Sequence, residues 1–354
     1  MQDPKFIAAQ FAIEGNILDI KPLGNGLIND TFRVYTDGEN DYVLQRINTA
    51  IFKDVELLQH NIECATAHIR RKGGLTLTFI PCKATGKTYW TDGETHWRVS
   101  VFIKGAYTYE TVNPEYSYYA GKAFGQFEAM LSDIPDTLGE TIPDFHNMEL
   151  RARQLHEAVN ADAAGRMADP EVQAILADLL PYEEQMCKAE RMYREGTLPK
   201  RICHCDTKVN NMMFDEKGNI LCVIDLDTLM PSFVFSDFGD FLRTAANTVA
   251  EDDPAIEKVD FKMDIFEAFA KGYLEGARSF LTPVEIENLP YAACLFPYMQ
   301  AVRFFADYIN GDTYYKIKYP EHNLVRTRNQ VALFHAAMAK VPQMNDFIQQ
   351  QMLA

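Results

Sequence analysis

The first hundred residues alternate apolar and polar positions with the two-residue period that is typical of β-strands. Residues 23–35 are predicted to form two strands around a glycine turn, and residues 42–47 and 76–80 are predicted to form further strands. Residues 54–71 carry apolar positions at helical spacing instead. The pattern over residues 1–103 therefore predicts a small β-rich lobe that includes one helix.

Beyond that point the spacing of apolar residues becomes helical. An aromatic stripe over residues 113–131 is interpreted as core packing on one face of a helix. Further helices are expected over residues 261–278, 283–308 and 328–351. We therefore expect an α/β fold, more narrowly α+β, in which a small β-rich lobe (1–103) precedes a larger, mainly helical lobe (104–354).

A polar motif interrupts the second lobe. After Ile202 and Cys203 the chain has the pattern H-x-D-x-K-x-x-N, which is that of a kinase catalytic loop. In that interpretation Asp206 accepts the proton of the acceptor hydroxyl and Lys208 reaches the γ-phosphate. Asn211 and Asp225 offer the hard oxygen ligands that magnesium prefers.

The spacing of the two magnesium ligands favours this interpretation. Residues 212–214 and 220–224 are apolar and enclose a turn sequence, so they predict a hairpin. Pairing of its strands would bring Asn211 and Asp225 together at the open end. The alternative is an ordinary hairpin with a polar base.

A glycine turn in the first lobe predicts the nucleotide site. Gly24, Asn25 and Gly26 lie between two strands, where backbone N–H groups can approach phosphate without obstruction by a Cβ atom. These residues and Thr31, on the strand that follows, are candidate contacts of ATP. A lone G-x-G pattern is more often only a turn.

The lysine that kinases carry on their third strand is missing here. That position holds Gln45 or Arg46, and Gln45 is chosen because it shares the strand face of Val43. Phe102 and Ile103 end the last strand of the lobe, where a hinge would offer backbone groups to adenine. Glu63, on the helix of the lobe, is either an acidic partner of the nucleotide site or part of a solvated face.

Composition narrows the possible partners. The chain has 354 residues and a net charge of −16, which argues against nucleic acid and anionic membranes as partners. It has no apolar run of membrane-spanning length and no apparent signal peptide at its start. The 7 cysteines are interpreted as reduced thiols of a cytoplasmic protein. Cys203 and Cys205 flank His204, but zinc usually needs four ligands and no second pair lies nearby.

With these motifs in place, the chain resembles the aminoglycoside phosphotransferase and choline kinase superfamily over nearly its full length. Within it, the chain resembles the N-acetylhexosamine 1-kinases. The segments that carry the resemblance are Gly24–Thr31, His204–Asn211, Ile224–Pro231, Asp237–Asp240, Arg303–Tyr308 and Lys318–Arg328.

The resemblance implies a kinase-like bilobal fold with a nucleotide-binding first lobe and a catalytic, substrate-binding second lobe. It implies ATP and Mg²⁺ as cofactors, Asp206 as the base, and Asn211 and Asp225 as magnesium ligands. It also implies that Arg303 and Tyr314 face the sugar, whose anomeric hydroxyl receives the γ-phosphoryl group. Leu27 departs from the relatives, which often carry a histidine there.

Several alternatives remain open at this stage. Arg303 lies among apolar residues on a helix, and it could pair with Asp307 four residues on instead of facing a cleft. Asp237 and Asp240 are expected to brace the catalytic loop or cap a helix. The acceptor could be another sugar or an amino alcohol, and a nucleotide-binding module without catalysis is a further alternative. The sequence leaves the preferred epimer and the choice between monomer and homodimer undetermined.

Overall fold

The computed structural model describes residues 3–24 and 29–353, and the described chain divides into two compact units. Unit 1 comprises Met1–Tyr109, Asp133–Pro143 and Asn210–Met230, and unit 2 comprises Glu110–Ser132, Asp144–Val209 and Pro231–Ala354. This division differs from the single boundary expected after residue 103. The hairpin of residues 212–223 belongs to unit 1, where Tyr107 forms an isolated β-bridge with Phe214.

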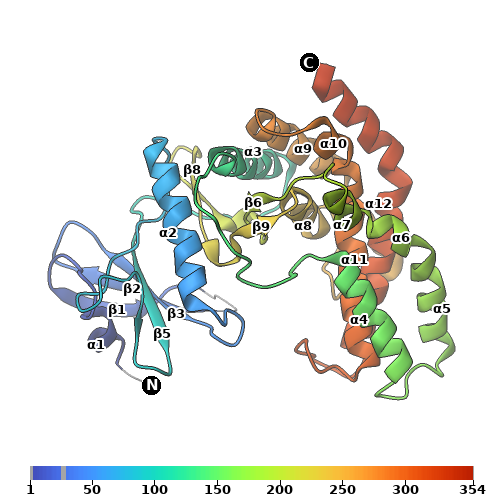
Figure 1. Cartoon of the computed structure of the whole chain (residues 1–354), viewed down its shortest axis with the longest axis horizontal. Helices are drawn as coiled ribbons and strands as arrows, with labels where there is room; N and C mark the ends of the chain where they lie inside the picture. The colour runs from blue at the N-terminus through green and yellow to red at the C-terminus, as the bar shows by residue number, and fades with distance from the viewer. Residues whose placement is uncertain (1–2, 25–28, 354) are drawn as a thin grey trace. The chain divides into compact units, whose positions relative to one another are not determined.

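Unit 1 is built on an antiparallel five-stranded sheet of order β1–β2–β3–β5–β4 (Figure 1). Leu44 pairs with both Phe32 and Val99, and this face of the sheet is closed by an apolar core that includes Ile7 and Phe11. The elements of the unit are α1 (Pro4–Ala8), β1 (Ile17–Pro22), β2 (Asp30–Thr36), β3 (Tyr42–Ile47), α2 (Val55–Arg71), β4 (Trp90–Thr91), β5 (His96–Val101), β7 (Met212–Phe214) and β8 (Ile220–Val223).

The opposite face of the sheet is the more polar one. Thr31, Gln45 and Arg98 lie in register on β2, β3 and β5, so their side chains share that face. Helix α2 begins after the N-cap Asp54, whose side chain accepts the Leu57 N–H. The expected strand over residues 76–80 is absent, and Phe79 makes only an isolated bridge there.

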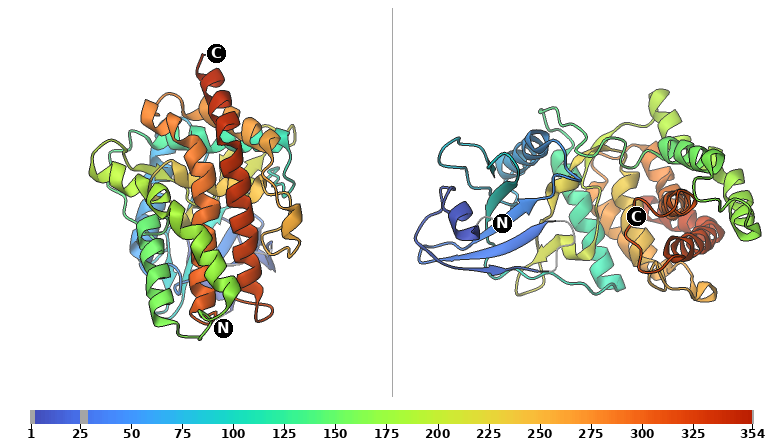
Figure 2. Two further views of the ribbon diagram at one scale, coloured as in Figure 1. Left: turned by 90° about the vertical axis from the view of Figure 1, so that its right-hand side faces the viewer. Right: turned by 90° about the horizontal axis from the view of Figure 1, so that it is seen from below.

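Unit 2 is mainly helical. Its elements are α3 (Pro114–Leu131), α4 (Met148–Ala161), α5 (Pro170–Leu179), α6 (Glu183–Met186), α7 (Lys188–Arg194), β6 (Arg201–Cys203), α8 (Phe235–Ala245), α9 (Met263–Ala277), α10 (Pro283–Glu287), α11 (Leu289–Ile309) and α12 (His322–Leu353), and β6 pairs with β9 (Met230–Ser232). Helices α11 (orange) and α12 (red) run side by side (Figure 2).

Helices α3 and α9 approach closely because glycines face each other across them. A Cβ atom at Gly121 would lie 2.1 Å from the Phe269 carbonyl oxygen, and one at Gly272 would lie 2.1 Å from that of Tyr118. Side chains at these positions would therefore force the helices apart. The predicted fold, a small antiparallel sheet lobe and a helical lobe of the kinase-like type, is confirmed. Over residues 3–24 and 29–353, no helix has the length and apolar character needed to cross a bilayer.

Candidate active site

The candidate catalytic residues fall into two groups that belong to different units. Asp206 and Lys208 lie in unit 2, in the loop that follows β6. Asn211 and Asp225 lie in unit 1, at the base of the β7–β8 hairpin.

The loop that carries Asp206 has an unusual backbone. Cys205, directly before it, has φ = 62°, in the left-handed region that a residue with a side chain rarely adopts. Such a conformation persists only where the surroundings enforce it, and it is often found at functional sites. Lys208 Nζ lies 2.5 Å from Asp206 Oδ1, so the two candidate catalytic side chains form an ion pair.

Asp237 of α8 enforces that backbone. Its carboxylate accepts the His204 N–H at 2.8 Å and the Cys205 N–H at 2.7 Å, while the Thr207 hydroxyl donates to its carbonyl oxygen at 2.8 Å. Asp237 is fully buried. The prediction that Asp237 braces the catalytic loop is therefore confirmed.

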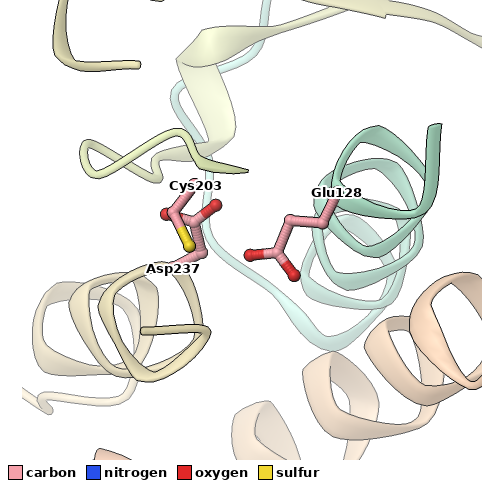
Figure 3. Close-up of side chains that lie close together, drawn as sticks. All are labelled: Glu128, Cys203 and Asp237. Carbon is pink, nitrogen blue, oxygen red and sulfur yellow. The ribbon is translucent and has the colours of Figure 1, made fainter. Parts of the chain in front are cut away.

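A buried cluster lies beneath this brace. Glu128 of α3, Cys203 of β6 and Asp237 place ligand-type atoms within 4.8 Å of one another, with Glu128 directed toward Asp237 (Figure 3). Burial raises the pKa values of Glu128 and Cys203 well above their usual ranges, which favours their protonated forms. The Tyr273 hydroxyl donates to Glu128 at 2.5 Å, and the Cys203 thiol donates to the Phe233 carbonyl. These hydrogen bonds and protonated forms favour a structural role for the cluster, as a support of the loop, over a role as a metal site.

Asp240, one turn beyond Asp237, holds the next peptide of the loop. Its carboxylate accepts the Thr207 N–H at 3.1 Å, as the expectation of a bracing role requires. Burial raises the pKa of Asp240 to about 6, and the nearby Asp206 carboxylate adds to the shift. Arg243 opposes it from 3.9 Å and also pairs with Glu251 at 2.8 Å.

A cavity of about 150 Å³ opens beside Asp206 within unit 2. Its polar lining comes from the catalytic loop and from α8 and α11, and aromatic residues close its sides. The lining residues are Phe145, His146, Cys205, Asp206, Lys208, Asp240, Arg243, Phe296, Met299, Gln300 and Arg303. A small acceptor molecule could meet the Asp206 carboxylate here.

Arg303 is in this cavity and is not paired with Asp307. Its guanidinium donates to the Gln300 amide at 3.2 Å and lies 5.9 Å from the ring of Phe145 and 5.6 Å from that of Tyr315. Among the described residues, no carboxylate lies within ion-pair distance of Arg303. The alternative in which Arg303 only supports the fold through Asp307 is thus wrong.

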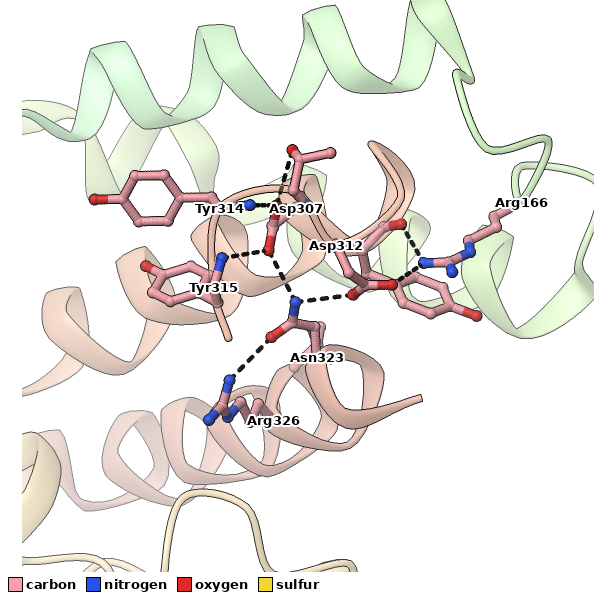
Figure 4. Close-up of polar contacts among 10 residues, drawn as sticks. Arg166, Asp307, Asp312, Tyr314, Tyr315, Asn323 and Arg326 are labelled. Atoms are coloured by element: carbon pink, nitrogen blue, oxygen red, sulfur yellow. Dashed lines mark hydrogen bonds and ion pairs between the residues drawn. The ribbon is translucent and has the colours of Figure 1, made fainter. Parts of the chain in front are cut away.

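Asp307 instead holds the loop that follows α11 (Figure 4). Its carboxylate accepts the backbone N–H groups of residues 313, 314 and 315 at 2.9, 2.8 and 3.0 Å and the side-chain amide of Asn323 at 2.9 Å. This arrangement places the Tyr315 hydroxyl within 3.1 Å of the Gln300 amide. Tyr314 packs edge-on against Tyr315, is 74% exposed and is not part of the cavity lining.

His146 is a cavity residue that the sequence analysis missed. Its ring stacks on Phe145 at 4.3 Å and meets the edge of Phe296 at 4.9 Å. Burial holds the pKa of His146 well below its usual range, and the positive charges of Arg303, Arg151 and Arg243 lower it further. His146 is therefore a neutral part of the wall at ordinary pH.

The hairpin of unit 1 forms as predicted. Met212 pairs with Val223, and the Ile224 N–H donates to the Asn211 carbonyl at 2.9 Å, so Asn211 and Asp225 meet at the same end. Like Cys205, Asp225 has a left-handed backbone conformation, with φ = 60°. The exposed Asp225 carboxylate and the Asn211 amide both offer hard oxygen ligands, which suit a cation such as Mg²⁺.

The candidate nucleotide contacts in unit 1 are only partly within the described residues. Asn25, Gly26 and Leu27 lie outside them, whereas Gly24 has φ = 72°, as a glycine turn requires. Gln45 donates to the Thr31 hydroxyl at 3.3 Å, so these two candidates are neighbours on one strand face.

The backbone N–H and the ring of Phe102, at the end of the last strand, both already have partners. The Phe102 N–H donates to the Asp41 carbonyl at 2.8 Å, and the Arg33 guanidinium lies 3.9 Å from its ring. An adenine contact at Phe102 and Ile103 would thus use other groups. Glu63 is exposed and accepts the Thr88 hydroxyl, whereas Gln59, one turn earlier on α2, is buried and faces Arg98.

One of the site residues outside the sequence predictions has a signal in the sequence. Gln300 lies three residues before Arg303 on one helix, a spacing at which helical side chains meet. His146 and Arg98 gave no comparable signal, because Phe296 and Asp227 reach them from segments far away in the chain.

Comparison with known proteins places this geometry in context. The profile of a family described as the phosphotransferase enzyme family matches residues 19–280. The fold is similar to an aminoglycoside phosphotransferase from Alicyclobacillus acidocaldarius, with a TM-score of 0.68, 13% identity, and 99% of this chain and 97% of that one covered. It is also similar to a microcompartment-associated aminopropanol kinase, with a TM-score of 0.62, 16% identity, and 96% and 97% covered. An amicoumacin kinase in complex with AMP-PNP and Ca²⁺ matches with a TM-score of 0.60, 12% identity, and 94% and 93% covered.

Proposed function

Because this chain belongs to the phosphotransferase enzyme family, we propose that it transfers the γ-phosphoryl group of ATP to the anomeric hydroxyl of an N-acetylhexosamine. The product would be the sugar 1-phosphate. The kinase-type loop around Asp206 and the sequence resemblance support the reaction type. The cavity next to Asp206 supports the acceptor class.

The observation that carries the acceptor assignment is the charge of this cavity. Three cations line it, Lys208, Arg243 and Arg303, against the two carboxylates Asp206 and Asp240. Each carboxylate already has a cation near it, whereas the partners of Arg303 among the described residues are the Gln300 amide and the rings of Phe145 and Tyr315. An acceptor with an ammonium group would meet repulsion here, whereas a neutral polyol would find donors.

The aromatic wall supports the same class of acceptor. Phe145 and Phe296 give the cavity flat apolar surfaces, and neutral His146 lies between them. Sites that hold small polar ligands commonly combine such surfaces with a few convergent donors. The Arg303 guanidinium has several donors in one plane, which suits sugar hydroxyls or an acetamido carbonyl.

In the proposed reaction, Asp206 orients the anomeric hydroxyl and accepts its proton as the oxygen attacks the γ-phosphorus. A sugar C1–O–P bond forms, the bond to the β-phosphate oxygen breaks, and ADP leaves. Lys208 offsets negative charge on the transferring group. Arg303 and the aromatic wall hold the ring so that one hydroxyl faces Asp206.

ATP and Mg²⁺ are the proposed cofactors. Asn211 and Asp225 would hold the metal, whose chemistry is to neutralise charge on the phosphate oxygens. The complex of the similar amicoumacin kinase with AMP-PNP and Ca²⁺ is consistent with a nucleotide and a divalent cation. Gly24, Thr31, Gln45, Phe102 and Ile103 stay as proposed contacts of the nucleotide, and Tyr314 of the sugar.

A product assay tests this proposal. The protein is incubated with ATP, Mg²⁺ and either N-acetylglucosamine or N-acetylgalactosamine, and the phosphorylated product is identified by ³¹P NMR. The expected product carries phosphate at C1. The methyl glycoside of each sugar is the matched control, because its anomeric oxygen is capped and should accept no phosphate.

The same assay with 1-amino-2-propanol, ethanolamine and choline covers the main alternative, an amino alcohol kinase. We expect no turnover of these cations above background. Faster phosphorylation of any of them than of both sugars would overturn the assigned acceptor class, and phosphorylation of the methyl glycosides would overturn the assigned hydroxyl.

A further inference from the structure

The position of the missing strand lysine is filled by an uncharged residue that contacts a buried arginine. Gln45 on β3 pairs in register with Arg98 on β5, and the Arg98 Nε–H donates to the Gln45 amide oxygen at 3.0 Å. The cation is thus on the neighbouring strand and on the same face of the sheet.

Arg98 is buried, with 3% of its surface exposed. Its guanidinium lies 2.5 Å from Asp227 Oδ1 and 3.4 Å from the Gln59 amide oxygen on α2. A buried guanidinium requires a compensating charge, and Asp227 is the carboxylate that supplies it. Arg98 and Asp227 thus form a buried ion pair.

Asp227 connects this pair to the proposed metal ligand. It lies two residues after Asp225, in the 3₁₀ turn Leu226–Thr228 that Asp225 precedes as the N-cap, so the backbone links the positions of the two aspartates. The Asn29 amide donates to Asp227 Oδ2 at 2.7 Å, and the Thr141 hydroxyl donates to its carbonyl oxygen at 3.1 Å.

Asn29 extends the network toward the nucleotide side. It lies three residues after Gly26 in the sequence, and its side-chain oxygen accepts the Asn48 N–H at 3.0 Å. Gln45, in turn, donates to the Thr31 hydroxyl. Every one of these residues belongs to unit 1.

We propose that Arg98 and Asp227 form a positioning pair that replaces the strand lysine and its carboxylate partner. The pair orients Asp225 for the magnesium–nucleotide complex and aligns the Thr31–Gln45 strand face with it. The inference rests on the proposed nucleotide and metal site but not on the identity of the acceptor. Arg98 acts through Asp227 and is a positioning residue.

The test compares Arg98→Met, Asp227→Asn and the double variant with the wild-type protein. ATP binding is measured by calorimetry with and without Mg²⁺, in the absence of any acceptor, and the melting temperature is measured on the same samples. The matched control is Arg46→Met, because Arg46 is an arginine of the same sheet, on β3, but forms a half-exposed pair with Asp30 at 3.6 Å.

Residues that orient a metal ligand typically change metal affinity by roughly 10- to 100-fold when they are replaced. We expect each single variant to weaken binding of Mg–ATP to that extent and to weaken metal-free ATP less. The double variant should regain melting temperature, because a neutral buried pair is tolerated, but it should not regain Mg–ATP affinity. Arg46→Met should bind like the wild type.

Two results would overturn the inference. The first is unchanged Mg–ATP affinity in Arg98→Met, or in Arg98→Lys if the methionine variant does not fold, since lysine lacks the planar fork. The second is an affinity that recovers together with the melting temperature in the double variant, which would mark a purely structural pair. Wild-type protein that binds Mg–ATP but phosphorylates no N-acetylhexosamine refutes only the proposed function, whereas wild-type protein that binds no ATP refutes both.

Discussion

Lys208 Nζ lies 2.5 Å from Asp206 Oδ1, so the proposed base and the proposed phosphate-contacting cation meet before any substrate is present. The backbone between them is fixed by Asp237 and Asp240, which accept peptide N–H groups of residues 204, 205 and 207. An acceptor hydroxyl would therefore enter a loop whose geometry is already set. Preorganisation of this kind reduces the entropy that is lost when the reacting groups are brought into the reactive geometry.

The first prediction concerns the base. Asp206→Asn preserves the shape of the side chain but removes its capacity to accept a proton, so turnover should fall by roughly 10²- to 10⁴-fold. ATP affinity should change little. Steady-state kinetics and nucleotide titration measure the two effects, with Asp346→Asn on the exposed side of α12 as the control. Near-normal turnover would remove Asp206 from the mechanism.

The second prediction concerns the proposed metal ligand. Asp225→Asn keeps a residue that tolerates the left-handed backbone at this position, where φ = 60°. It removes an anionic ligand worth several kcal/mol of charge stabilisation, so activity should fall roughly 100-fold or more. Nucleotide binding should also lose most of its dependence on Mg²⁺. A variant with the full Mg²⁺ dependence would show that the metal is held elsewhere.

The third prediction concerns the acceptor. Arg303→Leu removes a charged donor worth about 1.5–3 kcal/mol per hydrogen bond, so kcat/KM for the sugar should fall by about 10- to 100-fold. The ATP KM should hardly move. Because the N–H groups of residues 313–315 and the Asn323 amide bind the Asp307 carboxylate without Arg303, the melting temperature should change little.

Arg278→Leu is the control for this experiment, since Arg278 bonds to the Met352 carbonyl and not to the cavity lining. Sugar kinetics that stay normal in Arg303→Leu would exclude a role for Arg303 in acceptor binding.

The fourth prediction concerns stability and pH. Burial raises the pKa of Asp240 to about 6, above the value of about 3.9 expected in the unfolded chain. Between these values the folded protein holds a proton that the unfolded chain has released. The contribution of Asp240 to stability therefore falls as the pH rises from about 4 to about 6, by at most about 3 kcal/mol, and the loss is complete above that window.

Asp240→Asn has no such proton and should lack this contribution. Urea unfolding of both proteins across the window measures the difference between them. Parallel pH profiles for the two proteins would contradict the raised pKa of Asp240.

The sequence was sufficient where local signals decide structure. Strand β3 was predicted with its exact bounds, and Asp54 and Asn113 begin α2 and α3 as N-caps. The β7–β8 hairpin was predicted because its turn residues and both apolar strands are contiguous. The Asp237 brace followed from the motif.

The sequence failed where tertiary context decides. Residues 76–80 have strand-like composition, but beyond the single bridge at Phe79 they gain no ladder partner. Arg98 looked like an ordinary strand residue, because Asp227 is far away in the chain and becomes its partner only in the folded unit. The pairing of Arg303 with Asp307 was a reasonable local alternative, yet the loop peptides after α11 take up the Asp307 oxygens.

Asp307 holds the backbone of residues 313–315 through their N–H groups, and the side chains of Tyr314 and Tyr315 take no part in that attachment. The backbone course of this loop and the chemistry of its side chains can therefore change independently. Other side chains at positions 314 and 315 would project from the same backbone. Replacement of Asp307 would instead remove the hydrogen bonds that hold this backbone in place. Single replacements of Tyr315, which accepts a hydrogen bond from Gln300 of the cavity lining, would thus change the surroundings of the proposed acceptor site without rebuilding α11 or α12.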